Sequence, residues 1–301
     1  MKEEARREQE KVLERLFPFQ HRYMELESLK IHYIDEGEGP VMVLFHACPF
    51  WSFSFREVIK EFSRDHRVIA MDLLGFGLSD KPAEFDYTIN GYVAVLEEFL
   101  WRLGLNKMIF VLHGWGGTVG MGYAVRHPNF ISSLVIMNSI AFSGHKLPWQ
   151  LRLCRLPALG SLLVKCFLLY GSGHAALAPE VKNAYLLPFR EEYSKSQNPL
   201  LPVQKFIGSI PAVPEDDAAQ SILSIESGLW SFRMKPVCII WASHDFLYNR
   251  KALRLWHKCL PGAEIHTLER TTHYILEEQP ETFNDILRDF LKKNNLQEMD
   301  K

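Results

Sequence analysis

The chain has 301 residues, 47% of them hydrophobic, and a formal net charge of −2 at pH 7. This length fits one large α/β domain, or a core with an inserted subdomain. The near-neutral charge argues against a general nucleic-acid-binding surface, so we expect no nucleic-acid partner. Five scattered cysteines without a CxxC pair argue against structural zinc and a disulfide framework, and favour a reducing, cytoplasmic setting.

Residues 1–22 are predicted to form a charged helical extension. The first ten residues are mostly charged and contain no apolar run, so we expect no signal peptide. The most apolar region is 151–170, but its longest uncharged run, 156–164, has only nine residues. A membrane-spanning helix needs roughly 20. We therefore expect no membrane span, and we interpret this region as a buried helix in preference to a membrane-touching one.

Apolar runs that recur along the chain predict the strands of a mostly parallel sheet. Helical patterns separate most of these runs, which indicates helices on both faces of the sheet. The predicted strands are 24–26, 29–35, 41–45, 68–72, 108–112, 133–138, 237–241 and 264–268. The predicted core helices are 52–62, 90–103 with Asn90 as its cap, a helix that follows 113–117, 252–259 and 282–291.

The region between 140 and 229 has a different pattern. Its periodicity is helical and is interrupted by eight prolines, which suits an inserted helical cap better than further core strands. We therefore predict an α/β core at 23–139 and 230–296, with a helical cap at 140–229.

The stretch 108–127 carries the clearest functional signal. A buried strand at Met108–Leu112 leads into a tight turn at 113–117, after which the spacing becomes helical. Strand, small-residue turn and helix form the frame of a nucleophile elbow, which lifts one side chain above the sheet edge in α/β-hydrolases. The lifted position is Gly114, which has no nucleophilic side chain.

Cofactor and metal chemistry receive little support. Glycines at 75 and 77 follow a predicted strand, as in dinucleotide-binding loops. However, Asp80 stands where such a motif has its third glycine, and Pro82 blocks an early helix. The sequence has no HExxH or CxxC motif that would indicate a metal site. We expect neither a cofactor nor a metal.

Five motifs stand in the order in which haloalkane dehalogenases have theirs, and the chain resembles that family from about Tyr23 to Leu291. The five are His46–Ser52, Gly75–Pro82, His113–Gly117, Asp245 and Thr272–Glu277. Met121–Pro128 and Ile210–Pro211 are most similar to the subgroup that contains the β-lactone decarboxylases of olefin biosynthesis. The resemblance implies an α/β-hydrolase fold with a helical cap, acting on a small apolar molecule.

The resemblance also implies roles for individual residues. It makes His273 the general base, Asp245 the acid that orients it, and Trp115 the indole that steadies a leaving group. Cys48 takes the loop position that assists this indole. Asn138 stands where one subgroup keeps its acid instead.

The chain departs from the family pattern at two places. Gly114 replaces the nucleophilic aspartate, and Ala47 with Cys48 replaces a glycine and a polar residue. Loss of the carboxylate abolishes the first step, in which an ester forms with the enzyme. The base that would activate a water molecule for the second step is still present. We favour Cys48 as a small pocket-lining residue over a substitute nucleophile. His113 is predicted to point away from the elbow apex, into packing.

Two functions remain open at this stage. The first, which we favour, is a dehalogenase-like hydrolase for a haloalkane or β-lactone type of substrate. It works either through water activated by His273 or as a Gly114 variant of an aspartate enzyme. The second is a catalytically silent α/β-hydrolase that binds a hydrophobic ligand, or a protein partner at the cap. A vacant Gly114 position enlarges the pocket and suits binding, whereas a retained His273–Asp245 pair suits catalysis.

Overall fold

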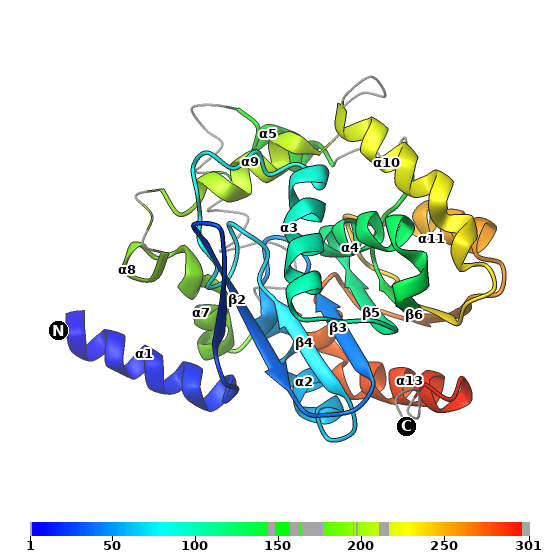
Figure 1. Ribbon diagram of the computed structural model, residues 1–301. Helices are drawn as coiled ribbons and strands as arrows, with labels where there is room; N and C mark the ends of the chain where they lie inside the picture. Colours follow the sequence, from blue (N-terminus) through cyan, green and yellow to red (C-terminus); the bar gives the residue numbers. More distant parts are fainter. Residues whose placement is uncertain are drawn as a thin grey trace.

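The computed structural model describes residues 2–143, 148–156, 163, 177–194, 196, 198–210 and 217–296. Its centre is an eight-stranded sheet with the order β1-β2-β4-β3-β5-β6-β7-β8 (Figure 1). Strands β3 to β8 pair in parallel, whereas β2 is antiparallel to both of its neighbours. The strands are β1 Arg22–Leu26, β2 Leu29–Glu36, β3 Val41–Phe45, β4 Arg67–Met71, β5 Met108–His113, β6 Ile131–Met137, β7 Val237–Ala242 and β8 Glu264–Leu268. The predicted mostly parallel sheet is confirmed.

Helices cover both faces of this sheet, because its central strands are apolar on both sides. In β3, Val43 and Phe45 face one buried cluster, whereas Met42 and Leu44 face the other. The first cluster lies under α3 Ile89–Arg102, α4 Gly114–Arg126 and α11 Arg250–Cys259. The second lies under η1 Ser52–Phe55, α2 Arg56–Phe62, α12 Ile275–Glu278 and α13 Pro280–Lys293. Figure 1 shows these two layers on opposite sides of the strands.

Helix α3 begins earlier than the sequence pattern predicts, and its cap is a different residue. Thr88 has an extended backbone, and its hydroxyl accepts a hydrogen bond from the backbone N–H of Gly91 at 3.1 Å. Asn90, the predicted cap, already lies inside the helix, where its Oδ1 accepts a bond from Arg126 Nη2. The prediction of Asn90 was wrong because Thr88 and Asn90 are both good cap residues, and only the backbone decides between them.

Five α-helices of the described chain stand between β6 and β7. They are α5 Trp149–Leu153, α7 Pro179–Leu186, α8 Glu191–Ser194, α9 Leu201–Ser209 and α10 Asp217–Gly228, with η4 Leu187–Phe189 and η5 Leu229–Phe232 as 3-10 turns. Figure 1 places α5 and α9 beyond the carboxyl ends of the strands. Most of the buried helix predicted at 151–170 lies outside the described residues.

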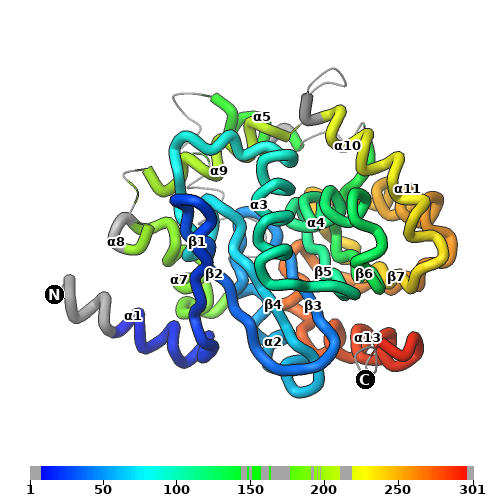
Figure 2. Tube along the Cα trace, viewed as in Figure 1, coloured from blue at the N-terminus to red at the C-terminus, as the bar shows by residue number. Residues whose placement is uncertain are grey.

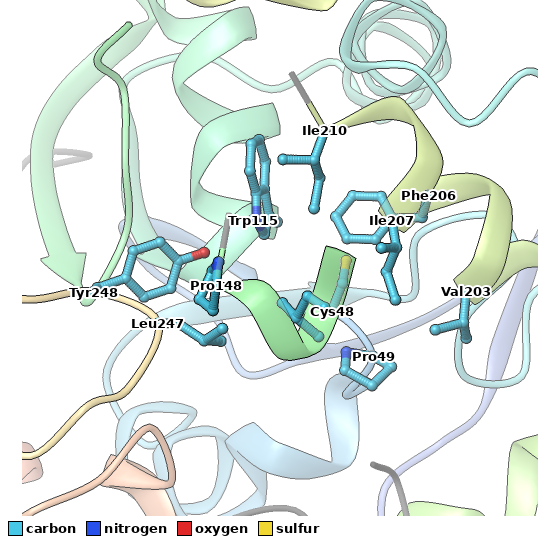
Figure 3. Close-up of a pocket in the computed structure, with 11 residues that line it drawn as sticks. Cys48, Pro49, Trp115, Pro148, Val203, Phe206, Ile207, Ile210, Leu247 and Tyr248 are labelled. Carbon is cyan, nitrogen blue, oxygen red and sulfur yellow. The ribbon is translucent and has the colours of Figure 1, made fainter. Parts of the chain in front are cut away.

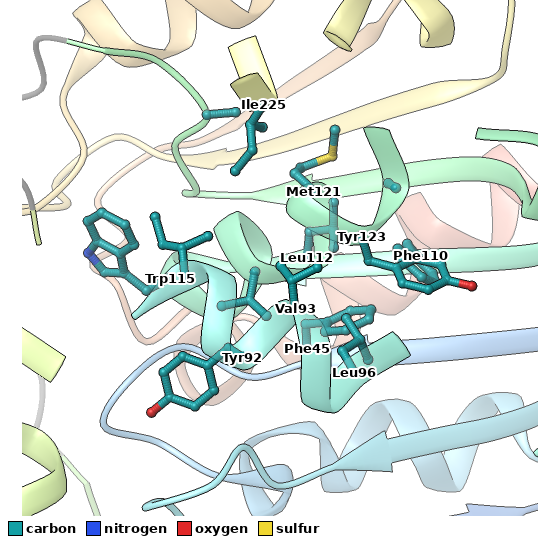
Figure 4. Close-up of a cluster of buried hydrophobic side chains, with 14 of the residues drawn as sticks. Phe45, Tyr92, Val93, Leu96, Phe110, Leu112, Trp115, Met121, Tyr123 and Ile225 are labelled. Atoms are coloured by element: carbon teal, nitrogen blue, oxygen red, sulfur yellow. The ribbon is translucent and has the colours of Figure 1, made fainter. Parts of the chain in front are cut away.

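Helix α10 packs on the core and not over the end of the sheet. Ile225 lies in the same buried cluster as Val93 of α3 and Met121 of α4 (Figure 4). The helices approach closely here because Gly122 has no side chain: a Cβ on it would lie 2.6 Å from Val93 Cγ2. The region between β6 and β7 is therefore anchored to the core along this helix.

The N-terminal helix α1 Lys2–Leu16 lies beside α7, as the trace in Figure 2 also shows. Arg190 Nη1 donates a hydrogen bond to Gln9 Oε1 at 2.6 Å, and Arg15 pairs with Glu180. Phe17, immediately after the helix, is fully buried. Among the described residues, no helix is long and apolar enough to cross a membrane.

Candidate active site

The elbow predicted at Gly114 stands at the carboxyl end of β5, where α4 begins. Gly114 has a φ of +55°, in the left-handed region that glycine adopts most easily. Two residues later, a Cβ on Gly116 would lie 2.0 Å from the carbonyl oxygen of His46. Glycine at 116 therefore allows the first turn of α4 to pack directly against the loop that follows β3.

His273 and Asp245 come together beside this turn. His273 Nδ1 and Asp245 Oδ2 are 2.6 Å apart, and both residues are almost fully buried. The opposite ring nitrogen, Nε2, lies 3.2 Å from the position that a Cβ on Gly114 would occupy. The imidazole is thus held at one nitrogen and directed at the elbow apex with the other, which is the geometry of a base and its orienting acid.

The Asp245 carboxylate is fixed by further donors. Its Oδ1 accepts from the backbone N–H groups of Leu247 at 2.7 Å and Tyr248 at 3.3 Å. Its Oδ2 also accepts from Asn138 Nδ2 at 2.8 Å, while Asn138 Oδ1 accepts from the Ala242 N–H at 2.7 Å. Asn138 therefore ties the end of β6 to the end of β7 and supports the acid from a neighbouring strand.

His113 is buried and packed, as expected, but it packs against the His273 ring and does not point away from the site. Its ring centroid is 4.5 Å from that of His273, and Phe50 lies near both rings. The ring approaches the backbone of His273, yet neither of its nitrogens has a hydrogen bond of normal geometry within the described chain. Burial, reinforced by the neighbouring His273, lowers the pKa of His113 well below its usual value. A neutral, packed imidazole thus forms one wall behind the base.

An apolar pocket lies between the elbow and the helices that follow β6 (Figure 3). Trp115 and Cys48 form part of its wall on the core side, together with Tyr248. Figure 3 shows side chains of α9 on the other side. The lining residues are Cys48, Pro49, Trp115, Pro148, Leu151, Val203, Phe206, Ile207, Ile210, Leu247 and Tyr248. A wall of this composition suits a small apolar ligand.

The Cys48 thiol is poorly suited to act as a nucleophile. Burial raises the pKa of Cys48 well above its usual value, so the thiol is neutral near pH 7. The thiolate is the nucleophilic form of cysteine, and a nearby cation would be needed to stabilise it. Burial is the cause of the shift in the pKa of Cys48, and it favours the neutral thiol. Its position beside Trp115 is that of a residue lining the pocket.

The structure brings together Gly114, His273 and Asp245, which the sequence analysis singled out, whereas the sequence predicted neither the position of Tyr248 nor the contact that Ala47 makes. Tyr248 lines the pocket, and its ring centroid lies 5.5 Å from that of His273. The signal for it was weak, since it only follows Asp245 by three residues. His244, the neighbour of Asp245, is directed toward Ser243 and not toward the pocket residues: Ser243 Oγ and His244 Nδ1 are 2.9 Å apart. Ala47 contacts the elbow and is described below.

Comparison with known proteins places this geometry in a family. A model of the α/β-hydrolase fold family matches residues 40–280. The cis-3-alkyl-4-alkyloxetan-2-one decarboxylase of Shewanella oneidensis is 32% identical over 293 residues, covering 93% of this chain and 91% of the relative. The haloalkane dehalogenase of Psychrobacter cryohalolentis is 30% identical over 288 residues, covering 89% of each chain.

A solved structure supports the same placement. The haloalkane dehalogenase DpaA from Paraglaciecola agarilytica superposes with a TM-score of 0.77 at 26% identity, covering 95% of this chain and 96% of the other. The sequence comparison and the structure comparison therefore agree on the fold, an α/β-hydrolase with a mostly parallel sheet. The chain belongs to the α/β-hydrolase fold family, among the relatives of haloalkane dehalogenases and β-lactone decarboxylases.

Proposed function

We propose that the chain hydrolyses a small apolar substrate with a reactive carbonyl group, of the β-lactone type, using a water molecule activated by His273. The observation that carries this proposal is the position of His273 Nε2, 3.2 Å from where a Cβ on Gly114 would stand. In an aspartate enzyme that space belongs to the nucleophile. Here a base faces it directly, which supports attack by water in place of a side chain.

The reaction can be written with this chain's own groups. His273 Nε2 takes a proton from water as the water oxygen bonds to the carbonyl carbon. Asp245 stabilises the imidazolium that forms, through the 2.6 Å contact at Nδ1. The ring C–O bond then breaks, His273 returns the proton to the departing alkoxide oxygen, and a hydroxy acid results.

The start of α4 suits the negative charge that develops during this attack. Backbone N–H groups in the first turn of a helix have no partner within the helix, and the positive end of the helix dipole lies there. Trp115 is the residue that follows the elbow apex, so its N–H belongs to that first turn. Donors aimed at a developing oxyanion are among the largest contributors to catalysis of acyl transfer.

A carbonyl substrate suits this site better than a haloalkane. Displacement of a halide needs a strong, positioned nucleophile, and the effective molarity of a bound water is well below that of a fixed carboxylate. Addition to a carbonyl gains from both the base and the helix terminus. Among the relatives, the decarboxylase named for an oxetan-2-one ring acts on a compound that contains such a carbonyl.

Silent binding of a hydrophobic ligand is the second candidate. It is favoured by the missing nucleophile at Gly114 together with the apolar wall around Trp115 and Phe206. Under this alternative, the His273–Asp245 pair is inherited without use. A protein partner at the cap belongs to the same alternative.

The experiment compares hydrolysis of short-chain 3,4-dialkyl β-lactones with halide release from 1-bromoalkanes. Acid formation is followed at constant pH for the unmodified protein, for His273→Ala, and for His244→Ala as a matched control at an exposed histidine. We expect lactone hydrolysis that is lost in His273→Ala and retained in His244→Ala, with little halide release. Saturable thermal stabilisation by the lactone, without any acid formation, would instead establish the binder.

A further inference from the structure

Ala47 lies too close to Gly114 for a side chain to start from the elbow apex. A Cβ built on Gly114 would lie 2.7 Å from the Cβ of Ala47 and 3.3 Å from its Cα. Outside its own residue and its chain neighbours, a Cβ atom in a protein essentially never has another heavy atom within 3.0 Å. His273 Nε2 is the second close neighbour, 3.2 Å from the same Cβ position. A side chain at the apex therefore needs one of these two neighbours to move.

Ala47 has little freedom to move. It is fully buried, in the loop that follows β3. Its carbonyl oxygen lies 3.0 Å from His46 Nδ1, and His46 Nε2 accepts a hydrogen bond from the backbone N–H of Leu73 at 3.0 Å. The His46 carbonyl also rests against Gly116 at the start of α4. The loop is thus held between two other segments of the core.

We infer that Ala47 and Gly114 are a complementary pair, in which the methyl group at 47 requires glycine at 114. Ala47 is then the residue that determines the reaction route, because it excludes every side-chain nucleophile from the apex. This goes beyond the proposed function, since the pairing holds whether or not water reacts there. It also means that Gly114 is not a single-residue variant of an aspartate enzyme: a carboxylate at 114 needs a change at 47 too.

Thermal unfolding of substituted full-length chains tests the pair. Gly114→Ala is measured in the unmodified background and in an Ala47→Gly background. Gly104→Ala is the matched control, because Gly104 also has a positive φ, +64°, but, its chain neighbours aside, no heavy atom of the described residues lies within 4 Å of its added Cβ. The control reports the conformational cost of a left-handed alanine alone, which we expect to lower Tm by about 2–4 °C.

We expect Gly114→Ala to lower Tm by more than twice the control, and the excess to disappear when Ala47→Gly is present. An equal loss of Tm in both backgrounds, or a loss no greater than the control's, would overturn the pairing. If Gly114→Ala is insoluble, a soluble Ala47→Gly/Gly114→Ala chain supports the pairing. An insoluble double variant beside folded Ala47→Gly would overturn it. No substrate is used, so failure of the proposed hydrolysis leaves this result unaffected.

Discussion

Arg56 and Glu277 form a buried ion pair that joins α2 to the helix after His273. Two parallel contacts, of 2.5 and 2.6 Å, link the guanidinium to the carboxylate, and the two side chains are only 10% and 6% exposed. Burial alone lowers the pKa of Arg56, but its hydrogen bonds and the charge of Glu277 outweigh this and raise the pKa above its usual value. Tyr185 of α7 also donates to Glu277 Oε1, at 2.6 Å.

Glu277→Gln removes the main counter-ion of the buried Arg56 charge and leaves only the exposed Glu57, whose Oε1 lies 3.9 Å from Arg56 Nε. Loss of one member of a buried ion pair costs about 3–5 kcal/mol, whereas an apolar replacement of both members is often neutral. At about 1.5–2 °C per kcal/mol for a chain of 301 residues, we expect Glu277→Gln to lower Tm by roughly 5–10 °C. Tyr185→Phe removes one hydrogen bond to a charged group and should cost about 1.5–3 kcal/mol.

Urea and thermal unfolding of five chains measures this: unmodified, Glu277→Gln, Glu277→Leu, Arg56→Met and the double variant Arg56→Met/Glu277→Leu. The double variant should be more stable than either of the two single variants that it combines, because no charge is left uncompensated. A Glu277→Gln shift below about 2 °C, or a double variant that loses the sum of both single effects, would refute the reasoning.

Three further predictions concern other parts of the chain. Burial alone raises the pKa of Asp72, but His32 and the backbone N–H of Ser52 reverse this and lower it from 3.8 to about 2. The native state therefore gains stability above about pH 4, and this gain is lost as the pH falls toward 2. Asp72→Asn should lower the free energy of unfolding at pH 7 by roughly 2 kcal/mol, and its stability should depend less on pH between 4 and 2. Thr88→Ala should cost about 1 kcal/mol in urea unfolding, with Asn90→Ala within about 0.5 kcal/mol of unmodified protein; the reverse order would restore Asn90 as the cap. Cys48→Ala should keep lactone hydrolysis within about threefold because its thiol is neutral, and a loss like that of His273→Ala would make it the nucleophile.

Much of the fold could be predicted because the central strands are apolar on both faces. The run Val41–Phe45 has one interpretation as a buried strand, and the structure has a strand with the same bounds. The order of the strands could not be read in the same way, since pairing of β3 with both β4 and β5 depends on crossovers between distant segments. The exact residue at which a helix begins was also hard to predict. Thr88 and Asn90 are both good cap residues, and the backbone angles decide between them.

In the site, too, features within one continuous segment could be predicted, whereas contacts between distant loops could not. Gly114 stood out because a strand, a tight turn and a helix meet there within one continuous segment. His273 and Asp245 came from motif order, and their 2.6 Å contact joins loops that lie 28 residues apart. The contacts of Gly114 with Ala47, and of His113 with His273, leave no local pattern, because they arise only when separate loops are packed at the end of the sheet.

The central claim is that water activated by His273 attacks the substrate without a covalent intermediate. Intact-protein mass spectrometry of the unmodified chain, acid-quenched during turnover of a saturating β-lactone, tests it most directly. We predict that hydroxy acid accumulates while the protein keeps its unmodified mass. A protein mass increased by that of the lactone during turnover, or the absence of any hydroxy acid, would contradict the account.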